Sequence, residues 1–480
     1  MLRGTPPRLN RQSPYSHKLL ANAAERLRAD LIDPVLNAED VSPGEKLESL
    51  RAVLQRLTAR CYAIHITTED RDEAYQLFTV LNDRGRSLSD GDLLRTRTLE
   101  LLEGHATMQQ PAEGNWDQVL KSSPAQVRGF LRSYYASHRG RRWPSKDLHK
   151  VFWSAFFLFT APLDAEHAEA VVGRIQALAE EHATYLKIQA GEWPYEDATS
   201  SAWHIQRLSR LVKILRQQAS VPLLLSIART RDESFFSQVV TFLERFTFRY
   251  NISGGHASQL GDRYYSESKK VRNAPDAYTL EALEEALIAQ LARYSPESIF
   301  RSNLAQRMNY QVSPTPLIKH FLTTLDDYAP WLDAGAEGTP TPDTITAYDL
   351  QALEVEHIYP QHPRQHIEEL DPHIHALGNL TFWAPGDNRS ANNAPLPEKQ
   401  PRYRDSRVRM TRAVGELDSW DSRQLLARQE DLIRRALNVF RFRIPSAVEV
   451  REESAAQAWF VQQNPGSRYR DREGRLSRSP

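Results

Sequence analysis

The residues best suited to chemistry lie in the last third of the sequence. Glu356 and His357 are adjacent and are followed by Pro360, and two asparagines, Asn379 and Asn388, come nine residues apart. A carboxylate and an amide oxygen are ligands that a hard divalent cation prefers. An imidazole with a pKa near neutrality can act as a general base. The set predicts a site that hydrolyses a phosphodiester bond with one Mg²⁺ or Mn²⁺ ion.

The order of these residues constrains how they meet. Glu356 and Asn388 are the expected metal ligands, and His357 is the expected base. Neighbours on a strand point to opposite faces, so Glu356 and His357 reach one ion only where the strand ends. Pro360 favours such an end.

The second metal ligand has alternatives. Asn392 and Asn393 follow Asn388 closely, and three prolines after them should delay or kink the next helix: Pro395, Pro397 and Pro401. Either asparagine is therefore an alternative to Asn388. Zinc is an alternative ion, because four further histidines lie in the same polar region: His362, His366, His373 and His375.

A basic stretch lies downstream. From Lys399 to Arg412 six cations stand against one anion, Asp405. Lys and Arg side chains neutralise the phosphates of nucleic acid backbones. We expect duplex DNA as the partner, with Lys399, Arg402 and Arg404 among its backbone contacts.

Composition limits the class of protein. The 480 residues hold 61 Lys and Arg against 61 Asp and Glu, which excludes a binder whose whole surface is basic. The one cysteine, Cys61, excludes intramolecular disulfides and a zinc site of four cysteines. No segment reaches the roughly 18 apolar residues of a membrane span. We therefore expect a cytoplasmic protein with no membrane partner.

The N-terminal and middle elements follow from hydrophobic spacing. Residues 15–60 and 116–333 have helical periodicity, and Tyr62–Ile66 alternates like a short strand. Ser89 is the expected N-cap of a helix that begins near Asp90. The middle of the chain should therefore be a large helical region.

The C-terminal elements are shorter. Ala334–Asp343 is rich in Gly, Pro and Thr and is typical of a linker. A short strand is expected at Leu380–Trp383, and a periodic helix at Trp420–Phe442. Five arginines between Asn464 and Pro480 predict an unstructured basic arm.

The segments VEHIYPQ and LGNLTFWAPGDNRSANNAPLPEK resemble the HNH, or ββα-metal, nuclease motif, and more narrowly its DUF1524 branch. In that family the residue before the histidine and a later Asn or His hold the metal. The histidine activates water, and a middle asparagine ties the loop between two strands. The resemblance assigns these roles to Glu356, Asn388, His357 and Asn379.

A second resemblance lies upstream. The segment FTVLNDRG, followed by LS and DLL, is similar to the signature of DUF262, a domain with a ParB/sulfiredoxin-like core. The matching positions include Asn82, Arg84, Gly85 and Asp92. DUF262 pairs with DUF1524 in GmrSD-type modification-dependent restriction enzymes. Complete DUF262 domains also carry a D-G-Q-Q-R motif that handles nucleotide, and this sequence has none, so we expect an N-terminally truncated chain and no assured nucleotide cofactor or NTPase activity.

Together these observations predict a mainly α fold with a partial α/β (ParB/sulfiredoxin-like) N-terminal piece and a small C-terminal ββα-metal (HNH) domain. The expected divisions are the DUF262 part, a helical region, a linker, the DUF1524 nuclease domain and a basic tail: residues 1–105, 106–333, 334–350, 351–445 and 446–480.

The expected function is a metal-dependent DNA endonuclease of a phage-defence, modification-dependent restriction system. The alternative from another class is a catalytically silent DNA-binding or regulatory fragment, and an RNA-directed nuclease is a third reading. A separate N-terminal chain and a second copy of this chain are both compatible partners.

Overall fold

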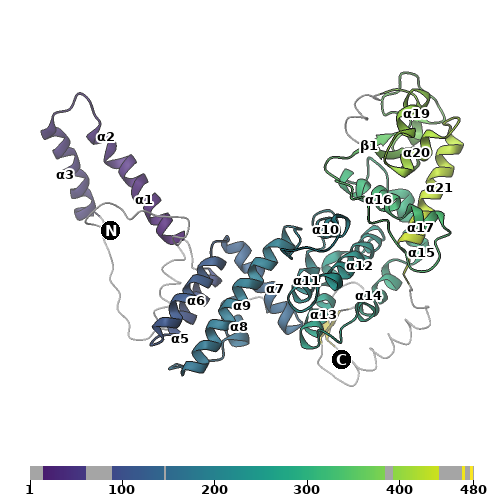
Figure 1. Cartoon of the computed structure of the whole chain (residues 1–480). Helices are drawn as coiled ribbons and strands as arrows, with labels where there is room; N and C mark the ends of the chain where they lie inside the picture. The colour runs from purple at the N-terminus through teal and green to yellow at the C-terminus, as the bar shows by residue number, and fades with distance from the viewer. Residues whose placement is uncertain are drawn as a thin grey trace. The chain divides into compact units, whose positions relative to one another are not determined.

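The computed structural model describes residues 15–60, 89–144, 147–159, 161–383, 393–442, 468–470 and 476–478. The chain divides into two compact units (Figure 1). Unit 1 comprises Met1–Leu131 and Pro144–Glu180, and unit 2 comprises Arg132–Trp143 and Glu181–Pro480. Helices dominate the described residues, which confirms the mainly α prediction.

The described part of unit 1 is helical. Two helices contribute residues to both units, α7 (Pro124–Arg139) and α9 (Ala165–Gln189). The others are α1 (Tyr15–Leu31), α2 (Asp33–Leu36), α3 (Pro43–Arg60), α5 (Asp90–Leu101), α6 (Ala106–Val119) and α8 (Leu148–Phe156). Ser89 caps α5 as predicted, and its hydroxyl accepts a hydrogen bond from the backbone N–H of Asp92 at 3.2 Å.

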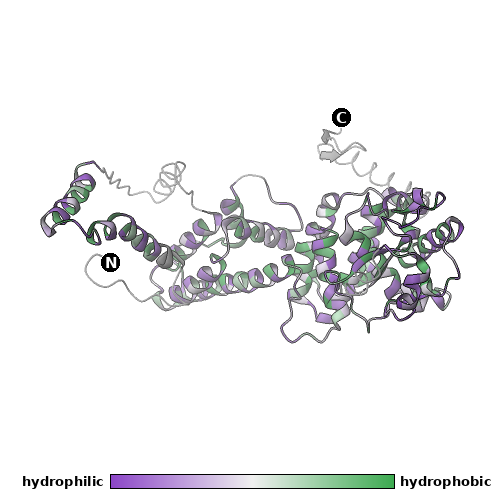
Figure 2. Cartoon of the chain, turned by 90° about the horizontal axis from the view of Figure 1, so that it is seen from above, coloured by the Kyte–Doolittle hydropathy of each residue, from purple (hydrophilic) through white to green (hydrophobic). Residues whose placement is uncertain are grey.

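The three N-terminal helices make no core among the residues described. Hydrophobic residues lie along α1 and α3 (Figure 2), and six of their leucines are exposed: Leu20, Leu27, Leu31, Leu47, Leu54 and Leu57. Leu27 and Leu54, for example, are 59% and 61% exposed. The predicted strand Tyr62–Ile66 lies outside the described residues, and the described part of unit 1 contains no strand, so the α/β N-terminal piece stays a prediction.

Unit 2 begins with a helical array. Its first elements are α10 (Ala202–Ser209), the π-helix η1 (Arg210–Ile214), η2 (Gln218–Ser220), α11 (Val221–Thr230), α12 (Glu233–Ile252), η3 (Ala257–Leu260), α13 (Gly261–Asn273), α14 (Leu280–Tyr294), α15 (Glu297–Arg307), α16 (Thr315–Asp327) and α17 (Ala329–Asp333). No helix in the described parts of the chain is both long and apolar enough to cross a membrane.

A two-stranded sheet follows. The next elements are β1 (Glu354–His357), η4 (Asp371–His373), η5 (Leu377–Asn379), β2 (Leu380–Trp383), α19 (Leu396–Arg404), α20 (Arg409–Gly415) and α21 (Ser422–Val439). β1 and β2 are antiparallel, with Glu356 opposite Thr381 and His357 opposite Leu380. The predicted strand Leu380–Trp383 is therefore confirmed, and β1 ends at His357.

One hydrophobic core joins the helical array to the sheet. Phe248 of α12 stacks on Phe440, the residue after α21, with ring centroids 4.4 Å apart. Phe382 of β2 belongs to the same buried cluster. The segment 334–350, expected to separate two domains, therefore lies between elements of a single core.

The expected linker is attached along its length. The backbone N–H of Asp343 donates to the carbonyl of Asp327 at 2.7 Å, and the Asp343 carboxylate pairs with Arg409. The indole N–H of Trp331 donates to the carbonyl of Glu337 at 2.8 Å. Burial of apolar side chains on both sides outweighs the flexible composition of the loop itself.

The C-terminal tail also contains paired backbone. β3 (Arg468–Arg470) and β4 (Leu476–Arg478) form an antiparallel pair. The described residues of the arm that we expected to be unstructured therefore form a short two-stranded sheet.

Candidate active site

Glu356 and His357 are the last two residues of β1, where the antiparallel ladder ends before Pro360. Successive residues of a strand point to opposite faces. Glu356 and His357 nevertheless both line one cavity of about 380 Å³. Other side chains of the wall come from segments on either side: Tyr310, Thr315, Lys319, Asn393 and Lys399. Glu354 and Val355 line the same cavity, so neighbouring residues reach it along the whole of β1 and not only at the strand end.

Asn379 joins the two strands at this end. Its side-chain amide donates to the carbonyls of Tyr359 at 2.8 Å and Ile374 at 2.7 Å. Its side-chain oxygen accepts from the backbone N–H of Tyr359 at 2.8 Å and from the indole N–H of Trp420 at 3.3 Å. Asn379 is fully buried, so these contacts fix the loop that follows His357.

Glu356 is buried against α19. Its Oε1 accepts from Nζ of Lys399 at 2.7 Å and from the hydroxyl of Tyr403 at 3.0 Å. Burial raises the pKa of Glu356 and lowers the pKa of Lys399, and the attraction within the pair opposes both shifts. Lys399 also donates to the carbonyl of His357 at 2.8 Å, so the pair ties α19 to the end of β1.

His357 sits in an aromatic corner. Its ring lies edge-on to Tyr310, with centroids 4.6 Å apart, and 5.6 Å from the ring of His375. Its Nε2 is 3.2 Å from the side-chain nitrogen of Gln361. Burial, helped by His375 and Lys399, lowers the pKa of His357 to about 3. The imidazole is therefore neutral at physiological pH and can accept a proton, but this pKa makes it a weaker base than the near-neutral imidazole expected from the sequence.

The donor types fit a divalent cation, with one restriction. Glu356 provides a carboxylate at the cavity, and Asn393 provides an amide there. Asn388 and Asn392 lie outside the described residues. Lys399 occupies one oxygen of Glu356, so a cation held by this carboxylate has to share it with, or displace, the ammonium group.

The described residues contain no histidine cluster that would hold zinc. They contain no grouping of three or more His, Cys, Asp or Glu suited to a metal. His366 instead lies 3.2 Å from the carboxylate of Asp371, and His375 packs beside Tyr310.

The three expected DNA contacts differ in exposure. Lys399 is 1% exposed and is held by Glu356, so its ammonium faces the interior rather than a phosphate. Arg402 is exposed on α19. Arg404 is half exposed, donates to the carbonyl of Gly415 at 3.0 Å and lies 3.6 Å from Glu416. Burial therefore gives Lys399 a structural role, and the DNA contacts of Arg402 and Arg404 stay predictions.

The DUF262 positions are mostly outside the described residues. Asn82, Arg84 and Gly85 fall there. Asp92 is described, and its carboxylate accepts from the hydroxyl of Ser89 at 2.6 Å and from the backbone N–H of Ser89 at 3.0 Å. In this structure the Asp92 carboxylate completes the capping box at the start of α5.

Sequence reasoning missed several residues of the site. Tyr403 and Tyr310 contact Glu356 and His357 from other elements, and Arg428 of α21 donates to the carbonyls of Gly378 and Leu380 at 2.7 and 2.8 Å. The basic stretch contained Tyr403, whose spacing of four from Lys399 places both on one face of a helix. No local pattern singled out Tyr310 or Arg428.

Comparison with known proteins adds one family. Residues 294–435 match the family model described as the C-terminal domain of GmrSD restriction endonucleases. The match begins at the end of α14, covers β1, β2 and Asn379, and ends inside α21. It supports the GmrSD-type resemblance over this part of the chain. No curated protein matched the sequence.

Proposed function

We propose that this chain is a metal-dependent DNA endonuclease of the HNH type, working in a modification-dependent restriction system of phage defence. The observation that carries the proposal is the Glu356–His357 pair at the open end of β1, with Asn379 fixing the loop beside it. The family match over residues 294–435 supports a restriction endonuclease.

The side chains divide the work by their chemistry. A bound Mg²⁺ or Mn²⁺ supplies charge stabilisation to the phosphate and the leaving oxygen. Glu356 and one asparagine, Asn388, Asn392 or Asn393, would hold it. His357, neutral in the folded protein, takes a proton from the attacking water. Lys319 lines the cavity wall and donates to the carbonyl of Leu350 at 3.1 Å, and its charge would favour a bound phosphate.

Plasmid cleavage tests the proposal. Supercoiled plain and modified DNA are incubated with the whole chain and Mg²⁺ or Mn²⁺, with and without EDTA. We expect metal-dependent nicking or linearisation that His357→Ala lowers by about 10²-fold or more. His366→Ala is the matched control, since this exposed histidine lies outside the cavity wall, and it should cleave like the wild type.

Two results would count against the nuclease assignment. Cleavage that persists in His357→Ala would show that His357 is not the general base. Cleavage that persists in EDTA would show that the reaction does not need a divalent cation. Thermal unfolding of each variant, followed by circular dichroism, separates lost chemistry from lost structure.

The silent DNA-binding fragment is the second candidate. The observation in its favour is that Lys399 neutralises Glu356 and occupies one of its oxygens. Exposed leucines on α1 and α3 also fit a piece that works with a separate N-terminal chain or a second copy. Folded protein that binds duplex DNA but cleaves none of the substrates would favour this candidate.

A further inference from the structure

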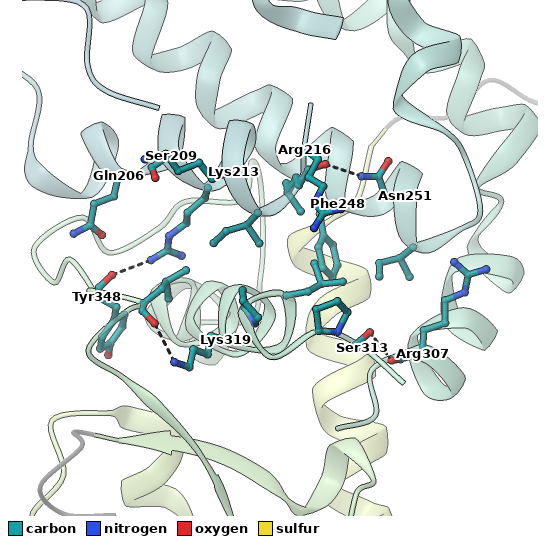
Figure 3. Close-up of a pocket in the computed structure, with 18 of the residues that line it drawn as sticks. Gln206, Ser209, Lys213, Arg216, Phe248, Asn251, Arg307, Ser313, Lys319 and Tyr348 are labelled. Atoms are coloured by element: carbon teal, nitrogen blue, oxygen red, sulfur yellow. Dashed lines mark hydrogen bonds between the residues drawn. The ribbon is translucent and has the colours of Figure 1, made fainter. Parts of the chain in front are cut away.

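A second, larger cavity lies in unit 2 beside the candidate active site. Its volume is about 1030 Å³, at the upper end of the roughly 300–1000 Å³ typical of small-molecule sites. Its walls come from α10, η1, α12, the start of α16 and the segment 348–351 (Figure 3). Lys319 lines both this cavity and the one that holds His357.

The cavity wall is strongly cationic. It contains five Lys or Arg residues against one carboxylate, Asp349. The cations are Arg210, Lys213, Arg216, Arg307 and Lys319. They come from η1 and the residues around it, from the end of α15 and from α16, so they approach a ligand from several sides (Figure 3). Such an arrangement favours a ligand with more than one negative charge.

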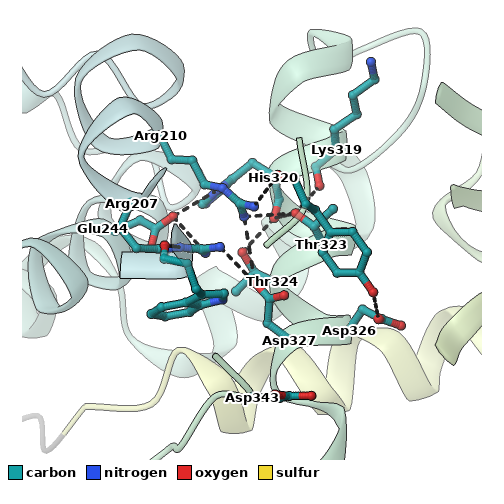
Figure 4. A network of polar contacts seen from close by, with 12 residues as sticks. Arg207, Arg210, Glu244, Lys319, His320, Thr323, Thr324, Asp326, Asp327 and Asp343 are labelled. Atoms are coloured by element: carbon teal, nitrogen blue, oxygen red, sulfur yellow. Dashed lines mark hydrogen bonds and ion pairs between the residues drawn. The ribbon is translucent and has the colours of Figure 1, made fainter. Parts of the chain in front are cut away.

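Arg210 is a built-in part of this wall and not a surface cation. It is 2% exposed, donates to the hydroxyl of Thr323 at 3.1 Å and to the carbonyl of Tyr348 at 3.4 Å, and leaves its Nε without a hydrogen-bond partner. Beside it, Arg207 pairs with Asp327 at 3.0 Å and with Glu244 at 3.3 Å (Figure 4). This network fixes the Arg210 guanidinium with one donor unused.

Two amides of the wall carry unused acceptors. The side-chain oxygens of Gln206 and Asn251 are buried and have no hydrogen-bond partner. Asn251 donates its amide nitrogen to the carbonyl of Leu215 at 3.2 Å, which fixes the orientation of its side chain. A ligand that reaches these two oxygens would supply hydrogen-bond donors as well as negative charge.

The backbone here is unusual as well. η1 is a π-helix, a form that is frequent at functional sites. Two residues after it, Arg216 has a φ of 54°, in the left-handed region that a residue with a Cβ rarely adopts. The turn places both Lys213 and Arg216 at the cavity. The backbone strain at Arg216 therefore occurs where two cations are positioned.

We propose that this cavity binds a nucleotide. Lys213, Arg216 and Arg307 are exposed cations of the wall that phosphates would pair with. Amino and ribose hydroxyl groups would supply donors for Gln206 and Asn251. A polyphosphate without a nucleoside offers only acceptors and would leave both amides unpaired. Apolar side chains between the polar groups, such as Leu215 and Ile252, suit a base and sugar.

The nucleotide has two sources, a free nucleotide or a nucleotide of the DNA strand turned out of its stack. Calorimetric titration of the whole chain in EDTA distinguishes them without any cleavage. The probes are ATP, tripolyphosphate, and two short DNA duplexes that differ by one unpaired nucleotide. Since EDTA excludes the nuclease reaction, binding is read independently of the proposed function.

For a free nucleotide, we expect ATP to bind at least about tenfold more tightly than tripolyphosphate. The double variant Lys213→Gln with Arg216→Gln should weaken ATP binding by about tenfold or more, because two charged contacts are lost. Gln206→Leu should weaken ATP binding and leave tripolyphosphate unchanged. Arg263→Gln, an exposed cation of α13 outside the cavity, is the control and should bind ATP like the wild type.

If the ligand is a nucleotide of the DNA strand, we expect no binding of ATP. The duplex with the unpaired nucleotide should then bind more tightly than the paired one, and the double variant should lose this preference. Equal binding of ATP and tripolyphosphate would overturn the proposal in favour of a plain anion site. Binding of ATP and of both duplexes that is the same in the double variant and the wild type would also overturn it.

Discussion

At the scale of single residues, the pair of Glu356 and Lys399 decides what the carboxylate can do. Both side chains are at least 95% buried, and the ammonium also donates to the carbonyl of His357. A buried charge that loses its partner is costly, whereas the pair as a whole is close to neutral in its effect on stability. The pair therefore sets the geometry of the strand end more than the stability of the fold.

Lys399→Met tests this role. The substitution leaves Glu356 buried without its cation, and we expect the free energy of unfolding in urea to fall by about 3–5 kcal/mol. Adding Glu356→Gln should restore most of the loss, since neither charge then remains. Arg402→Gln, an exposed cation on the same helix, should change stability by less than about 0.5 kcal/mol. A loss of unfolding free energy in Lys399→Met as small as that in Arg402→Gln would contradict the role of the buried pair.

His320 predicts a pH dependence of stability. Its ring is fully buried, and burial, with the charges of Arg210 and Arg207, holds its pKa well below the usual value of about 6.5. Above pH 6.5 the ring is neutral in both states. Below it the unfolded chain takes up a proton that the folded protein excludes, so stability falls as the pH falls.

The measurement compares the unfolding free energy of wild type and His320→Gln at pH 7.5 and 5.5. The wild type should lose about 1.4 kcal/mol more than the variant over this interval. Burial raises the pKa of Asp327 to about 6 and also raises that of Glu244, but both acids remain in the two proteins. His256→Gln, at an exposed position, should behave like the wild type. Parallel pH profiles for all three would contradict a neutral buried His320.

At the scale of elements, η5 has to lie directly against α21 for Asn379 to reach the loop after β1. Gly378 makes this approach possible, because a Cβ there would overlap the carbonyl oxygen of Leu425. Arg428 reinforces the contact by donating to the carbonyls of Gly378 and Leu380. The carbonyl belongs to a helix backbone and cannot move aside easily.

Gly378→Ala should therefore force η5 away from α21. We expect a loss of about 1–3 kcal/mol in unfolding free energy and a loss of plasmid cleavage as Asn379 shifts. Gly114→Ala in α6 is the control, because nothing lies within 4 Å of its new Cβ. That change should be neutral or stabilising by up to about 1 kcal/mol. A stable, active Gly378→Ala would show that the contact is not tight.

At the scale of the whole molecule, residues 334–350 connect two halves of one core. Phe248 and Phe321 from the helical array pack with Phe382 and Phe440 from the other side of this segment. If the chain is cut in this loop, the two fragments should therefore stay associated. The apolar surface buried between the two halves stabilises their contact far more than the covalent connection through one loop.

Protease cleavage tests this continuity. A recognition site inserted after Gly338 should be cut without dissociation, and the two fragments should elute together in size-exclusion chromatography until denaturant is added. Residues 351–445 produced alone should show no cooperative thermal transition, since Phe382 and Phe440 would lose their partners. Fragments that separate without denaturant, or a cooperatively folded 351–445, would support the independent domain predicted from the sequence.

The sequence by itself determined the features that depend on local backbone chemistry. These are the helical middle of the chain, the Ser89 cap, the strand Leu380–Trp383, and the placement of Glu356 and His357 before a strand end. Each rests on periodicity, capping or turn residues within a few positions, where the pattern and the backbone conformation correspond directly.

The tertiary structure alone decided which side chains are buried and with whom. Lys399 belongs to a basic stretch that is typical of a nucleic-acid contact, yet packing turns it inward to a carboxylate more than 40 residues away. Tyr310 meets His357, and the expected linker joins one core, for the same reason. Burial and partners are set by contacts between segments distant in sequence, which composition and spacing do not encode locally.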